Sequence, residues 1–188
     1  NGNIYDIKLK PGSPDTIYAV TSNNFYKSDD GGGSFNIIET GLPADSGRLV
    51  IDVTPANSNY LYLLSAATNF TFQGLYKSTD SGETFTKTSE TTNIFESDQA
   101  WFDLALAVSS IDPNEIYVGC LNIWKSADGG DSFTRLNNWA FHNEAFTHAD
   151  IHYLRFFNDE LFAGTDGGFY KSKDGGATFQ DFTQGLQI

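Results

Sequence analysis

The sequence contains no methionine and a single cysteine, Cys120, among its 188 residues. One cysteine excludes a framework of internal disulfides. Because Cys120 lies in the apolar run 116–121, we expect a small buried side chain rather than a nucleophile. A chain that begins at Asn1 and lacks methionine is expected to be a processed or excised segment.

Basic residues are also scarce. Eleven Lys and Arg stand against 24 Asp and Glu, which gives a net charge of −13. Binding to nucleic acid requires a basic surface, so this class of partner is excluded. The charge is compatible with cation binding or a basic partner, although a solvated acidic surface is the simpler interpretation. No apolar run is long enough to cross a bilayer.

Long helical patterns are missing as well, and short apolar runs bounded by Pro, Asn, Asp and Gly take their place. Runs of this kind predict β-strands. The predicted strands fall into four groups of four: 4–10, 16–21, 25–28 and 34–38; 48–53, 60–65, 75–78 and 84–88; 102–108, 115–121, 123–126 and 132–136; 151–157, 160–165, 169–172 and 178–182.

One short stretch occurs four times, at intervals of 46 to 50 residues. It reads aromatic-Lys-Ser-x-Asp-x-Gly-x-(Ser/Thr)-Phe, and a repeat of this length is typical of a propeller, solenoid or array. Its Ser, Asp and Gly positions are Ser28, Asp30 and Gly32; Ser78, Asp80 and Gly82; Ser126, Asp128 and Gly130; Ser172, Asp174 and Gly176.

Four strands per repeat make one blade of a β-propeller. We therefore predict an all-β propeller domain of four-stranded antiparallel blades, with units of approximately 1–42, 43–90, 91–138 and 139–188. Four blades form either a complete ring or part of a larger propeller. In a partial ring, the open blade faces would favour self-association or contact with further blades.

The repeated stretch has the chemistry of a hairpin corner. Asp accepts hydrogen bonds from nearby backbone N–H groups, and Gly adopts the positive φ that other residues disfavour. We interpret the four stretches as structural turns. The alternative is a calcium or ligand loop formed by Asp30, Asp80, Asp128 or Asp174.

These stretches resemble the Asp-box (BNR) repeat of sialidases, xyloglucanase-type glycosidases and sortilin/Vps10 propellers. The resemblance implies a secreted or cell-surface propeller that binds its ligands at the face remote from the boxes, here called the top face. Two sequence patterns also hint at export: the glycosylation sequon Asn69-Phe70-Thr71 and the O-glycosylation pattern Asp15-Thr16-Ile17.

Two long aromatic loops connect the predicted blades at the top face. Exposed aromatic rings suit a carbohydrate or protein ligand, and the alternative is that they cover the blade ends as plugs. Loop 88–101 contains Phe95, Asp98 and Trp101, whereas loop 137–150 contains Trp139, Phe141, His142, Phe146, His148 and Asp150. The candidate ligand-binding residues are Trp101, Trp139, Phe141, His142 and His148.

A polar cluster follows the second of these loops. Strand alternation places His148, Asp150 and His152 on one face, and Asp166 ends the next strand at the same top face. These four residues form a candidate site for calcium or another divalent metal, or else a hydrogen-bonded network. The pattern His-x-Asp-x-His followed by Asp-Gly-Gly resembles sortilin-like bacterial propellers.

The resemblance raises two enzymatic possibilities. Sialidases use three arginines, and the only three here are Arg48, Arg135 and Arg155, of which Arg135 lies in an outer strand, so this activity is not expected. Xyloglucanase-type enzymes use two acids, and Asp166-Gly167-Gly168 resembles the setting of one, with Asp103 or Asp150 as its partner. The main prediction is a binding or assembly module without catalysis, and the alternative is a fragment of such a hydrolase.

Overall fold

The computed structural model describes residues 3–186; residues 1–2 and 187–188, at the ends of the first and last predicted units, lie outside the described part. The described residues contain strands, turns and bends, and no helix that could span a membrane. The strands are β1 (Asp6–Lys10), β2 (Ser13–Val20), β3 (Phe25–Ser28), β4 (Asn36–Ile38), β5 (Arg48–Val53), β6 (Leu61–Ala66), β7 (Phe72–Ser78), β8 (Thr86–Lys87), β9 (Ala105–Val108), β10 (Ile116–Gly119), β11 (Ile123–Ser126), β12 (Thr134–Arg135), β13 (Ile151–Phe157), β14 (Glu160–Thr165), β15 (Gly168–Ser172) and β16 (Gln180–Asp181).

The strands form four antiparallel sheets, each of four consecutive strands paired in chain order. The prediction of an all-β fold built from four-stranded blades is therefore confirmed. Eleven of the sixteen predicted ranges differ from the observed strands by one to three residues at one or both ends, and two of these differences have a clear local cause. β7 begins at Phe72 because the hairpin closed by Ala67 N–H and the Thr71 carbonyl keeps both strands paired beyond Gly74. β9 begins only at Ala105 because Phe102 N–H turns back to the Gln99 carbonyl.

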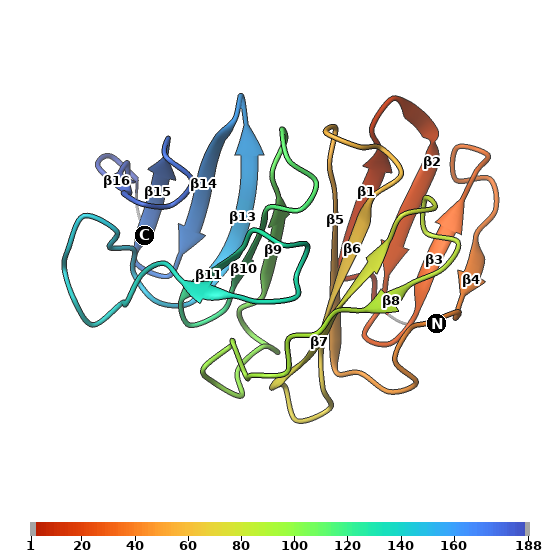
Figure 1. The fold of residues 1–188 in the computed structure, drawn as a ribbon, viewed down its shortest axis with the longest axis horizontal. Coiled ribbons are helices and arrows are strands. Elements are labelled where there is room, and N and C mark those ends of the chain that lie inside the picture. Colours follow the sequence, from red (N-terminus) through yellow and green to blue (C-terminus); the bar gives the residue numbers. More distant parts are fainter. Residues whose placement is uncertain (1–2, 187–188) are drawn as a thin grey trace.

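The four sheets stand in a row, with the innermost strands β1, β5, β9 and β13 packed in that order (Figure 1). The first and fourth sheets lie at opposite ends of this row, so the described residues form an open arc and not a closed four-bladed ring. We call the face that each sheet turns toward the next sheet its front face. The face turned toward the preceding sheet is its back face.

Three apolar layers fill the spaces between successive sheets. Each layer contains a fully buried tyrosine from the front face of one sheet: Tyr18, Tyr62 or Tyr117. The three hydroxyl groups lie within hydrogen-bonding distance of the carbonyls of Ser81, Pro113 and Gly175 in the next sheet, at 3.2, 2.8 and 3.0 Å, and that of Tyr117 is shared with Glu115 Oε1 at 2.6 Å. Burial of the ring supplies the apolar stabilisation, and the hydroxyl bond fixes the distance between sheets.

The four repeated stretches fold into the same turn. In the second, Thr84 N–H donates to Asp80 Oδ1 at 3.0 Å, Thr84 Oγ1 donates to Oδ2 at 2.6 Å, and Ser78 Oγ accepts from Gly82 N–H at 2.9 Å. The other three stretches contain the same set of bonds. Each carboxylate is thus occupied by donors of its own turn, as the structural interpretation requires.

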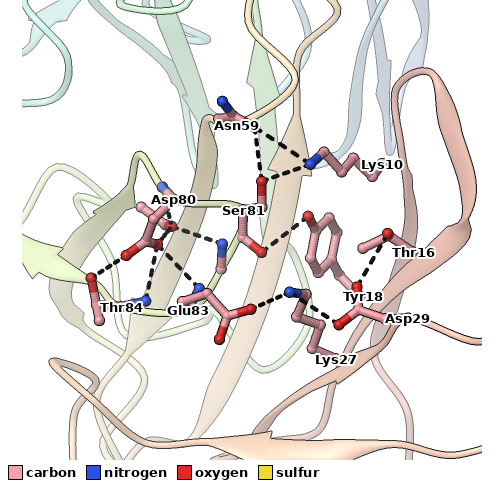
Figure 2. A network of polar contacts seen from close by, with 12 residues as sticks. Lys10, Thr16, Tyr18, Lys27, Asp29, Asn59, Asp80, Ser81, Glu83 and Thr84 are labelled. Carbon is pink, nitrogen blue, oxygen red and sulfur yellow. Dashed lines mark hydrogen bonds and ion pairs between the residues drawn. The ribbon is translucent and has the colours of Figure 1, made fainter.

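These turns lie at the face where the innermost strands end. Lys10, the last residue of β1, donates through Nζ to Ser81 Oγ of the second turn at 2.7 Å (Figure 2). In the same network, Lys27 of the first sheet pairs with Glu83 of this turn. The top face, where the innermost strands begin, is therefore the opposite one.

Candidate functional site

An arginine fixes the first top-face loop. Arg48 begins β5, and its Nη1 donates to the carbonyls of Ala100 and Trp101 at 3.0 and 3.2 Å. Its guanidinium carbon lies 5.6 Å from the centre of the Tyr5 ring. Burial lowers the pKa of Arg48, but an arginine remains charged at any pH at which the protein is folded. Arg48 thereby connects the first, second and third sheets at the top face.

Exposed aromatic rings lie next to this arginine at the top face of the third and fourth sheets. Trp101 and Phe102 are 61% and 45% exposed, with ring centres 5.6 Å apart and planes inclined by 47°. The rings of His152 and Phe102 are nearly perpendicular, with their centres 4.7 Å apart, and His152 Nε2 lies 2.5 Å from Asp166 Oδ1. We call Trp101, Phe102, His152 and Asp166 the aromatic ledge. It offers flat apolar surface beside hydrogen-bonding groups, which is the chemistry of a carbohydrate site.

Gln99, two residues before Trp101, joins two acidic side chains. Gln99 Nε2 donates to Asp103 Oδ2 at 3.3 Å and to Asp150 Oδ1 at 2.6 Å. Asp103 is fully buried, and burial raises its pKa to about 6, although the Gln99 bond opposes the increase. Because no surface of Asp103 is accessible, this carboxylate cannot touch a substrate. Asp150 is half-buried and stands closer to solvent.

Cys120 belongs to the same buried cluster. Its thiol lies 3.5 Å from Asp103 Oδ1 and 3.4 Å from Ser97 Oγ. The side chain is 1% exposed, and burial raises its pKa to about 12. The thiol therefore stays protonated, consistent with the expectation of a small buried residue.

The predicted metal set is not assembled, and the alternation argument behind it is wrong. β13 begins at Ile151, Asp150 has a φ of +63°, and the register of β13 shifts between Ile151 and Tyr153. His152 therefore faces Asp166, whereas Asp150 faces Gln99. Within residues 3–186, no three His, Cys, Asp or Glu side chains gather as metal ligands.

The remaining histidine of the predicted cluster covers a glycine. A Cβ atom on Gly167 would lie 2.2 Å from Cδ2 of His148, so only glycine fits beneath this ring. His148 Nδ1 lies 3.2 Å from the Ala149 carbonyl. The alternative of a hydrogen-bonded network describes this region better than a metal site does.

Loop 88–101 covers a blade end with one aromatic ring and contributes another to the aromatic ledge. Phe95 is fully buried against Phe72, at 5.4 Å between ring centres, while Trp101 at the end of the loop stays exposed. The Glu96 carboxylate accepts from Asn122 Nδ2 and Arg135 Nη1, both at 2.6 Å. Arg135 thus holds the loop from an outer strand, far from the ledge.

Loop 137–150 has a similar division of roles. Trp139 and Phe141 are 46% and 65% exposed, while His142 stacks on Phe146 at 3.9 Å. Phe146 packs against the apolar layer between the third and fourth sheets. Trp139 N–H donates to Asn122 Oδ1 at 3.0 Å, which ties the loop to the third sheet.

Sequence reasoning missed Gln99 and Phe102. Phe102 directly follows Trp101 at the start of the predicted strand 102–108, and this position beside an aromatic loop was the one available signal. Gln99 carried none, because its role depends on the meeting of Asp103 and Asp150.

A polar groove runs down the innermost strands from the ledge. It is lined by His152, Tyr153 and Arg155 on one side and by Asp6, Lys8 and Asp52 on the other. Asp6 Oδ2 accepts from Ile51 N–H at 3.1 Å, and Asp52 Oδ2 accepts from Val108 N–H at 2.8 Å. These carboxylates join neighbouring innermost strands, and burial raises the pKa of Asp52 to about 6.

No protein-family model matches the chain. Over 136 residues it is 32% identical to a xyloglucanase from Paenibacillus sp., an alignment that covers 67% of this chain and 12% of that protein. Several solved structures share the fold, and two of them illustrate the range. The GH74 xyloglucanase from Xanthomonas campestris has a TM-score of 0.75 at 17% identity, covering 100% of this chain and 31% of that one. YCF48 from Cyanidioschyzon merolae has a TM-score of 0.60 at 14% identity, covering 97% and 56%.

The chain thus spans about an eighth of the curated relative and under a third of the GH74 structure. At these identities the solved structures establish the fold alone. The chain has the architecture of a β-propeller, with sequence similarity to part of a xyloglucanase.

Proposed function

We propose that this chain is part of a glycoside-hydrolase-like propeller and binds a xyloglucan-type polysaccharide along its top face. The observation that carries the proposal is the aromatic ledge, where Trp101 and Phe102 remain exposed beside the His152–Asp166 pair. A secreted or cell-surface protein is the natural setting for such a ligand. The similarity to a xyloglucanase makes xyloglucan the first ligand to test.

The ledge suits a sugar chain in three respects. The Trp101 ring supplies a flat apolar surface for the C–H face of a pyranose, while Asp166 and His152 supply hydrogen-bonding groups for its hydroxyls. Arg48 holds the Trp101 backbone in place, which reduces the ordering required on binding. The adjoining groove provides further surface on which a long polymer can extend beyond the Trp101 ring.

Trp101→Ala is expected to weaken binding to xyloglucan by about tenfold, since the loss of one stacked ring corresponds to roughly 1.4 kcal/mol. Isothermal titration calorimetry with a xyloglucan oligosaccharide measures this directly. The matched control is Ile111→Ala, which removes a 73% exposed apolar side chain next to the strand ends on the opposite face. Equal affinities of wild type and Trp101→Ala, or no binding by the wild type, would contradict the proposal.

Hydrolysis is the second candidate function, and the exposure of the Asp166 carboxylate favours it. This carboxylate is exposed at the ledge and paired with His152, whereas Asp103 is inaccessible. Hydrolysis requires two carboxyl groups roughly 5 to 10 Å apart, and Asp150 is the candidate partner.

Under this second proposal, Asp166→Asn would reduce the release of reducing ends from xyloglucan by at least about 100-fold while binding persists. Trp101→Ala would instead weaken binding, so the two variants separate the two roles. An unchanged rate of release in Asp166→Asn would remove this residue from any catalytic role.

A further inference from the structure

The back face of the first sheet has the side chains of a buried surface, but no other sheet among residues 3–186 covers it. Ile7 pairs with Ala19 in the same register in which Leu154 pairs with Ala163 in the fourth sheet. Leu154 is 5% exposed because the third sheet covers it, whereas Ile7 is 58% exposed. Leu9, two residues farther along the same face, is 55% exposed.

The glycines of the four turns show the same contrast. A Cβ atom on Gly82 would lie 3.3 Å from Tyr18, and one on Gly130 or Gly176 would lie 2.4 Å from a leucine, always in the preceding sheet. These three glycines are buried, whereas Gly32 of the first turn is exposed. Each turn glycine therefore marks a surface on which the front face of a preceding sheet can pack. At the first turn, the described residues leave this surface uncovered.

The front face of the fourth sheet offers the matching surface. Phe162 pairs with Lys171 as Tyr18 pairs with Lys27, so Phe162 occupies the position of the buried tyrosines. It stacks on Phe169 at 5.7 Å and meets Phe157, which is 49% exposed. This aromatic face is similar to the one at the junction of the first and second sheets, where the rings of Tyr18 and Phe25 cover Gly82.

The charges at the two open faces are complementary. Lys77 Nζ donates to Asn114 Oδ1 of the next sheet at 3.0 Å. Lys171 occupies the position of Lys77, and Asp15 that of Asn114, since the carbonyls of both accept at 2.9 Å from the residue after a turn aspartate. Docking of the two faces would place Lys171, which also pairs with Glu160 of its own sheet at 3.2 Å, against Asp15.

We propose that two copies of this chain associate head to tail, with the front face of the fourth sheet on the back face of the first. Such a contact uses two different surfaces, so it can close into a ring. Two copies would give eight sheets, within the range of about four to eight blades that propellers use. The second copy would also complete the polar groove from the opposite side. This association does not depend on the polysaccharide proposal.

Sedimentation velocity from about 1 to 100 µM tests the association, in about 0.3 M salt to screen the net charge of −13. The wild type is expected to be dimeric. Phe162→Glu and Ile7→Glu are each expected to be monomeric, with circular dichroism spectra like that of the wild type. An equimolar mixture of the two variants is expected to regain dimers, because one of its two junctions is formed by unmodified faces.

A second experiment exchanges the charges of Lys171 and Asp15, whose side chains are half-buried and exposed, respectively. Lys171→Asp is expected to weaken dimerisation about tenfold, and the double variant Lys171→Asp/Asp15→Lys to restore it. A wild type that stays monomeric at the highest concentration would overturn the proposal and leave a different propeller blade as the occupant of these faces. Dimers in Phe162→Glu, or a mixture that remains monomeric, would overturn the head-to-tail arrangement.

Discussion

Gly130→Ala is expected to lower the free energy of unfolding by about 3 kcal/mol. The residue has a φ of +96°, at which a side chain adds strain of about 1 kcal/mol. Its Cβ would lie 2.4 Å from Cδ2 of Leu75, which is fully buried, and overpacking of this kind costs about 1–3 kcal/mol. Urea denaturation followed by tryptophan fluorescence measures the loss.

Gly12→Ala is the matched control for this change. Gly12 has a φ of +77°, but a Cβ there would meet no atom within 4 Å. Its replacement should therefore lower the stability by only about 1 kcal/mol, the strain alone. If both variants lost the same amount, the third turn would not be seated against the second sheet as described.

The free energy of unfolding is expected to be greatest near pH 4 and to decrease as the pH rises to about 6. Burial raises the pKa of both Asp103 and Asp52 to about 6, so their stabilising effect is complete below pH 3.8 and is lost as they ionise. Below pH 4 the stability should fall again. Hydrogen bonds from Ser132 hold the pKa of Asp128 at about 2, and Asp174 is lowered likewise by Thr178, so protonation of the turns removes their contribution.

Asp103→Asn isolates the contribution of one of these two carboxyl groups. Asparagine does not ionise, so between pH 4 and pH 7 the stability of the variant relative to wild type should rise by at most about 3 kcal/mol. Asp98→Asn, at an exposed position of the preceding loop, is the control and should follow the wild-type curve. Parallel curves for Asp103→Asn and wild type between pH 4 and pH 7 would show that this carboxyl is not held in its protonated form.

The fold was predictable because its determinants are local. Residues such as Asp80 and Gly82 specify a turn within five positions, and alternation identifies the flanking strands, so the ranges 25–28, 48–53, 123–126, 151–157 and 160–165 agree with the structure residue for residue. The open arc was one of two predicted alternatives, since the pattern of one blade does not encode how many blades close a ring.

The site was less predictable because it depends on contacts between distant segments. The alternation rule failed at Asp150, where a left-handed backbone precedes the strand, and at His152, where the register shifts. Trp101 was identified as an exposed ring in a long loop. Its support by Arg48, and the hydrogen bond from Gln99 to Asp150, join residues about 50 positions apart and leave no local signal.

Hydrogen–deuterium exchange with and without a xyloglucan oligosaccharide tests the central claim most directly, namely that the ligand face lies opposite the four turns. The account predicts slower exchange in residues 97–104 and 150–153, which carry or adjoin the ledge, and unchanged exchange in the turns 78–84 and 126–132. Protection of the turns, without protection around Trp101 and His152, would contradict it.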